Sequence, residues 1–97
     1  MVTVAVVLTL RLLETRSLKE KRAIVRSLVE RLRRRHRLSA AEVGLQDDVR
    51  RAQVGFATVS GDAATARQQA DDALRFIDDE LLGRAEVVGE LIEELVL

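Results

Sequence analysis

Positively charged side chains recur through the first third of the chain at spacings that would bring them together. Arginine fills four of the five positions from 33 to 37, and Lys19, Arg22 and Arg26 precede that run at intervals of three and four residues. Such intervals place side chains on one line of an α-helix. A line of cations can follow the phosphate backbone of a nucleic acid. The sequence therefore predicts an RNA-binding set, called the basic row below, of Lys19, Arg22, Arg26 and Arg33, extended by Arg34, Arg35 and Arg37.

The division of charge along the chain leaves two explanations for this row. Residues 1–37 hold 11 Lys and Arg against 3 Asp and Glu, a net charge of +8, whereas residues 38–97 hold 5 against 13, a net charge of −8. Either the basic part meets a polyanion, or the two halves of the chain neutralise each other. In the second case the partners of the row would be Asp71, Asp72, Asp78, Asp79 and Glu80.

No set of residues has the spacing that catalysis or metal binding requires. His36 is the only histidine, cysteine is absent, and no nucleophile accompanies His36. The acidic runs 47–48 and 78–80 lack the spacing of a calcium loop or a zinc site. We therefore expect no enzymatic activity, no cofactor, no metal and no small-molecule substrate.

Lys21 falls on the apolar side of the same predicted helix, one turn from its start, and so must extend to the surface or find a partner. The expected topology brings it close to the polar segment 46–48. We expect Lys21 to fix that loop through Gln46 and Asp47 as a structural contact, in preference to a binding site.

The pattern of apolar residues predicts the elements that position these side chains. Strict alternation over 2–12 predicts a strand, and Ser17 followed by Glu20 predicts a capping box that starts a helix over 17–35. Strands are expected over 38–45 and 52–60, followed by a second helix that begins after Asp62 and stops at Gly83. The last segment, 84–97, fits either a helix or a strand; Gly89 and the pair Val87-Val88 favour the strand.

The resulting order, βαββαβ, predicts one α+β domain over 1–97 with the ferredoxin-like fold. In this fold two helices cover one face of a four-stranded antiparallel sheet. A helix over 86–96 would contradict the fourth strand. The expected core contains Leu28, Leu32, Val54, Phe56, Leu74 and Ile77.

Several short motifs resemble those of the YlxP-like family of uncharacterised small bacterial proteins. They are Ser17-Leu18-Lys19-Glu20-Lys21-Arg22, Val25-Arg26-Ser27-Leu28, Ala41-Glu42-Val43-Gly44 with Gln46-Asp47, and Arg51-Ala52 with Gly55 before Val59-Ser60. The resemblance covers nearly the whole chain and implies a ferredoxin-like fold and a connection to the ribosome or RNA, with no known activity. Val49 departs from the family pattern, which has an aromatic residue, commonly Trp, after the Gln-Asp pair.

Composition bounds the setting in which the protein works. The lack of cysteine, of a secretory signal and of an apolar run of about 20 residues predicts a cytoplasmic protein without a membrane span. Preference for Arg and absence of Asn suit a GC-rich genome and a hot habitat.

The side chains on the uncovered face of the sheet should be small or aliphatic, and such a face predicts a homo-oligomer. Two functions follow as alternatives: an accessory factor that binds structured RNA or the ribosome through the basic row, or a non-enzymatic interaction domain that self-associates through its open sheet face.

Overall fold

Alternating apolar residues at the start of the chain form β1 (Val2–Leu12), whose even-numbered side chains are all buried. The computed structural model describes all residues 1–97 and continues with α1 (Leu18–Arg35) and β2 (Ser39–Gly44). The second half consists of β3 (Arg51–Ser60), α2 (Ala63–Leu81) and β4 (Ala85–Val96). The predicted order βαββαβ is confirmed, and the last segment is a strand.

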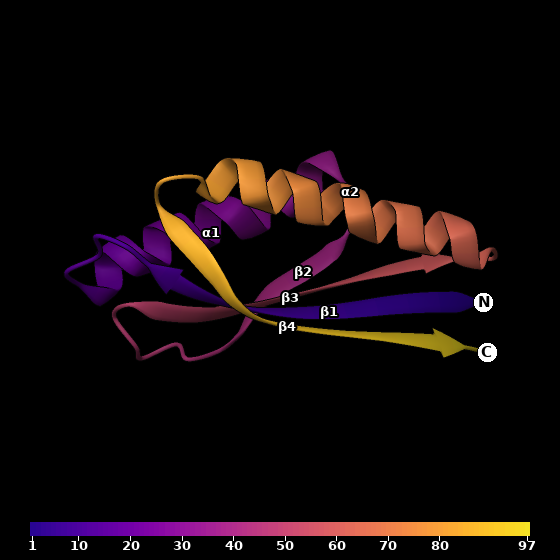
Figure 1. Ribbon diagram of the computed structural model, residues 1–97, viewed down its shortest axis with the longest axis horizontal. Coiled ribbons are helices and arrows are strands. Elements are labelled where there is room, and N and C mark those ends of the chain that lie inside the picture. Colours follow the sequence, from indigo (N-terminus) through magenta and orange to yellow (C-terminus); the bar gives the residue numbers. More distant parts are fainter.

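The four strands form one antiparallel sheet in the order β2-β3-β1-β4. Both helices lie on the same side of this sheet, and the two ends of the chain lie side by side at one end (Figure 1). There the Met1 ammonium donates a hydrogen bond to the Leu97 carbonyl at 2.7 Å. The architecture is the predicted ferredoxin-like one, with a helix-covered face and an open face.

Local hydrogen bonds explain where the helices begin. The Glu20 amide donates to Ser17 Oγ at 3.1 Å, as a capping box requires, but the Glu20 carboxylate accepts from the Arg16 amide instead of the Ser17 amide. In α2 the Asp62 carboxylate accepts from the Thr65 amide at 2.9 Å. This helix ends at Leu81, two residues before the predicted stop, and Gly83 turns the chain into β4 with a φ of +79°.

The core lies between the helices and the sheet and is almost entirely aliphatic. Twenty buried hydrophobic residues form one cluster, which includes five of the six predicted core residues, namely Leu28, Leu32, Val54, Phe56 and Ile77. Leu74 packs against this cluster but stays half-buried. No helix combines the length and the apolar character needed to cross a bilayer.

Candidate nucleic-acid interface

The basic row lies along the flank of α1 that faces β2, the edge strand of the sheet. The side chains of Lys19, Arg22, Arg26 and Arg33 are all exposed. The last three line a groove of about 260 Å³ between α1 and β2, together with Val25, Val29, Ala41, Glu42 and Gln46. The structure thus places the row beside the sheet edge, with an apolar floor between the cations and the strand.

Few contacts inside the molecule restrain the row. Arg22 meets the Asp47 carboxylate at 3.9 Å, a long contact to a side chain that is 99% exposed. Arg33 donates from Nε to the Ala40 carbonyl at 2.9 Å, which ties the end of α1 to β2 and leaves its other N–H groups available. No ion pair involves Lys19 or Arg26. Most of the positive charge therefore faces solvent.

The acidic residues of α2 do not neutralise this charge. Among the cations of α1, only Arg31 forms an ion pair with α2, through the Glu80 carboxylate at 2.5 Å, and Arg31 is not part of the row. Asp72 pairs with Arg75 on its own helix. α1 packs on β2, whereas α2 packs mainly on β1 and β3. The alternative in which α2 neutralises the row has no contact to support it.

The three arginines that extend the row at the end of α1 have two different environments. Arg34 is exposed, and Arg37 follows the helix with a φ of +53°, a left-handed conformation in the turn towards β2. Arg35 lies over the ring of Phe76 on α2, with its guanidinium carbon 5.4 Å from the ring centre. His36 ends the helix, and its ring lies 4.9 Å from the same phenyl ring. Arg35 is thus directed towards α2, away from the line of the other cations.

Lys21 lies at the inner edge of the same region and is fully buried. Its ammonium group donates to the carbonyls of Leu45, Gln46 and Arg51 at 2.8, 3.2 and 3.3 Å. The carboxylate next to it is that of Glu42 at 3.3 Å, not that of Asp47. Lys21 therefore contacts the Gln46 segment through main-chain oxygens and joins α1 to both ends of the connection between β2 and β3.

Sequence reasoning did not find Glu42, although a signal was present. Glu42 pairs in register with Val54, and Val54 is a fully buried residue on the helix-covered face. A lone carboxylate at a helix-facing position of a strand requires a buried cation. Lys21, the one cation on the apolar side of α1, is that partner.

Asp48 shapes the rest of the connection between β2 and β3. Its Oδ1 accepts from the main-chain amides of Arg50 and Arg51, both at 2.8 Å. These hydrogen bonds lower the pKa of the Asp48 carboxyl below its usual 3.8, and the one donated by the Arg50 amide has the larger effect. Lys21 therefore holds both ends of the loop that borders the groove, and Asp48 adds two hydrogen bonds within the loop.

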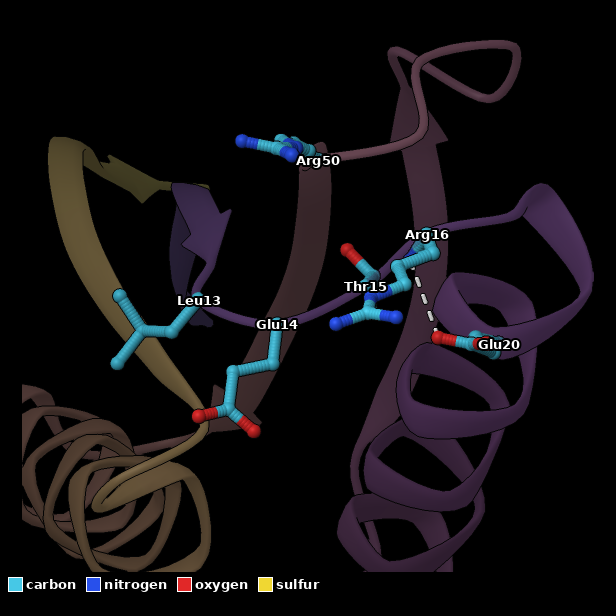
Figure 2. A pocket seen from close by; sticks show the side chains of 6 residues that line it. All are labelled: Leu13, Glu14, Thr15, Arg16, Glu20 and Arg50. Atoms are coloured by element: carbon cyan, nitrogen blue, oxygen red, sulfur yellow. Dashed lines mark hydrogen bonds between the residues drawn. The ribbon is translucent and has the colours of Figure 1, made fainter.

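A second, more polar hollow of about 560 Å³ lies at the start of α1. Figure 2 shows the side chains of Arg16 and Glu20 on the α1 side of this hollow, Leu13 and Glu14 on the opposite side, and Arg50 above them. Two arginines and two glutamates line it, so the charges balance. A polyanion would gain less here than along the basic row.

The fold and this flank define a small ferredoxin-like protein that carries a line of exposed cations beside one sheet edge. The family of proteins of unknown function DUF503 matches residues 3–89, and the chain belongs to that family. It is 36% identical over 62 residues to the uncharacterized protein YlxP of Bacillus subtilis (strain 168), a match that covers 64% of this chain and 67% of YlxP. The YlxP-like resemblance is thereby confirmed.

Solved structures support the same fold at low sequence identity. A putative chlorite dismutase superposes with a TM-score of 0.59 and 13% identity over 97% of this chain and 44% of its own. HapK from Hahella chejuensis superposes with a TM-score of 0.56 and 17% identity, covering 96% of this chain and 92% of HapK. The chain thus spans less than half of the putative chlorite dismutase. These likenesses concern the fold alone.

Proposed function

We propose that this protein is a non-enzymatic accessory factor that binds structured RNA, such as ribosomal RNA, through the basic row on the β2 flank of α1. One observation carries the proposal: the row is exposed and is not paired with the acidic second helix. Exposed cations on one line attract the successive phosphates of a polyanion backbone. This role places the protein in the cytoplasm, with the ribosome as the candidate partner.

The groove beside the row supports contact with the backbone of RNA instead of its bases. Its floor is formed by Val25, Val29 and Ala41, and the whole chain has only two aromatic residues, Phe56 and Phe76. Phe56 is buried and Phe76 packs against Arg35 and His36, so neither offers a platform for base stacking. Binding through phosphates and helix shape is tolerant of sequence.

The test is a titration of a fluorescein-labelled ribosomal RNA hairpin, followed by anisotropy between about 50 and 200 mM salt. The variant is Arg22→Gln with Arg26→Gln, which leaves the Arg33 contact to Ala40 in place. Because each lost phosphate contact lowers the salt slope by about one, the double variant should bind more weakly and with a slope shallower by about two.

The matched control is Arg67→Gln with Arg75→Gln, which removes the same charge from α2. It should keep both the affinity and the slope of the wild type. Equal losses in the two double variants would show a general charge effect and contradict a site on α1. Wild-type protein that fails to bind at the lowest salt would end the proposal.

A further inference from the structure

The face of the sheet opposite the helices is apolar and uncovered. On it lie Leu91, Leu95, Val59 and Val43, whose exposed fractions are 70%, 58%, 59% and 51%. Between these residues the face carries small side chains, such as Ala5 and Ala57. Glu93, between Leu91 and Leu95 on β4, interrupts this surface with a carboxylate. An exposed face with this many apolar residues is uncommon on a monomer.

This face has a ridge of exposed leucines at one edge and a shallow, open hollow at the other. Leu91 and Leu95 form the ridge on β4. The hollow, of about 270 Å³, lies over β2 and β3 and is lined by Ser39, Ala40, Ala41, Gly55, Phe56 and Ala57. A ridge and a complementary hollow on one surface are what two identical molecules need for a reciprocal contact.

The pairing register puts the ridge and the hollow at the same level of the sheet. Ala41 pairs with Gly55, Gly55 with Val7, and Val7 with Leu91, so one row across all four strands runs from the hollow to the ridge. A two-fold rotation about an axis parallel to the strands preserves this level and exchanges the two edges. It carries Leu91 of one copy over Ala41 and Gly55 of the other.

We propose that the open face binds a second copy of this chain, with the two sheets face to face and the two-fold axis parallel to the strands. Leu91 of each copy enters the hollow of its partner. Gly55 has no side chain, and Val43 of β2 covers part of the space above it, with one methyl group 3.1 Å from where a Cβ of Gly55 would be. Leu91 of the partner therefore packs beside Val43. The contact is isologous and therefore closes as a dimer.

The area available is large enough for a stable pair. Four strands about 4.8 Å apart, with ten residues of β3 rising about 3.3 Å each, give a face of about 600 Å² per copy. Two such faces bury about 1,200 Å², the lower end of the range for specific interfaces. Both helices and the basic row remain on the outside of this dimer.

The charge of β4 argues against the other symmetric arrangement, in which two β4 edges pair in a continuous sheet. This strand carries Glu86, Glu90, Glu93 and Glu94 and no basic residue. Two antiparallel copies side by side would bring these carboxylates together. In the face-to-face dimer Glu93 of one copy instead lies over Ser39 of the other, because Glu93, Ala5, Ala57 and Ser39 share one row across the sheet.

The first experiment compares two substitutions on adjacent residues of β4. Leu91→Glu changes the open face, whereas Ile92→Glu changes the other face of the same strand, where Ile92 is 50% exposed. Light scattering at high micromolar concentration should give twice the 10.8 kDa chain mass for the wild type and for Ile92→Glu, and the chain mass for Leu91→Glu. A monomeric wild type, or equal dissociation by both variants, overturns the proposal.

A disulfide test gives a positive result that does not depend on weakening the dimer. The chain has no cysteine, and Ala41 and Leu91 lie at opposite edges of one sheet, about 14 Å apart. They are too far apart to bridge within one copy. Oxidised Ala41→Cys/Leu91→Cys should therefore form a covalent dimer, while Ala41→Cys/Ile92→Cys should not. Absence of the first crosslink, or equal crosslinking in both, contradicts the proposed geometry.

Discussion

Lys21 shows how a single buried charge can organise a loop. Its ammonium group has four acceptors and no contact with solvent, and three of those acceptors are main-chain carbonyls from both ends of the connection between β2 and β3. Charge-assisted hydrogen bonds to carbonyl dipoles are stronger where water is excluded. The residue therefore holds α1, the loop and the start of β3 together.

Substitution of Lys21 by Met should lower the free energy of unfolding by about 3 kcal/mol, because the Glu42 carboxylate and the carbonyls lose their buried donor. Urea unfolding followed by circular dichroism measures this loss. The matched control is Lys19→Met, at an exposed position of the same helix, which should stay within about 0.5 kcal/mol of the wild type. Similar losses in both variants would show that the acceptors of Lys21 contribute little.

Asp48 predicts a dependence of stability on pH. The pKa of this carboxyl is lowered in the folded state from 3.8, chiefly by the main-chain amides of Arg50 and Arg51. Its contribution is therefore complete above the unfolded pKa and is lost as the pH falls through the folded one. We expect Asp48→Asn to be less stable than wild type at about pH 7, and this difference to shrink towards about pH 2.

Thermal unfolding across that pH range measures the difference in stability between the wild type and Asp48→Asn. The titration of the other carboxyls affects both proteins equally and cancels in this difference. Asp47→Asn is the control, because Asp47 accepts no hydrogen bond from the main chain and its side chain is 99% exposed. A stability difference for Asp48→Asn that does not change with pH would contradict the assigned cause.

At the scale of the elements, local signals predicted most of the fold. The alternation in β1 and the caps at Ser17 and Asp62 depend only on neighbours in the sequence, so their boundaries agree with the structure within a few residues. The candidate site was harder to predict from the sequence, because the groups that its residues contact belong to other elements. Main-chain carbonyls near Lys21, the Ala40 carbonyl near Arg33 and the Phe76 ring near Arg35 have no signature in the sequence.

The β4 segment shows why one prediction remained ambiguous until the structure was known. Its apolar residues fit a helical face as well as a strand, and most of them are exposed in the single chain. Burial within one copy therefore does not determine its conformation. Its conformation is determined by pairing with β1 along eleven positions. A register shift near Thr9 and Gly89 accommodates one extra residue, Val88, in β4.

The cap of α1 gives a prediction at this scale. Ser17→Ala should lower the free energy of unfolding by about 1 kcal/mol, since the Glu20 amide loses its acceptor. Ser27→Ala makes the same change inside the helix, where alanine is the better helix former, and should leave the stability equal or slightly higher. Chemical unfolding of the two variants distinguishes these effects. Equal destabilisation would mean that Ser17 contributes by packing.

Across the whole molecule, the two proposed surfaces share Ala41, which lines both the groove beside the basic row and the hollow of the open face. Because no cation of the row lines that hollow, we expect the two surfaces to act independently. The cations of the row belong to α1 and border the groove between α1 and β2, whereas the open face is the side of the sheet that the helices do not cover (Figure 1). A face-to-face dimer would therefore present two basic rows on its two outer surfaces. Such an arrangement leaves binding at each row unchanged and adds avidity only for an RNA long enough to reach both.

Leu91→Glu, the variant that should be monomeric, tests this independence. On a short RNA hairpin it should retain the wild-type salt slope, because no cation of the row is changed. On a long structured RNA it should bind more weakly than the wild type, by about a hundredfold if both rows engage together. Anisotropy with both RNAs at one salt concentration gives the comparison, and Ile92→Glu is the dimeric control of equal charge. A matching loss on the short hairpin would show that the sheet face itself contacts RNA, since the two surfaces would then share one ligand.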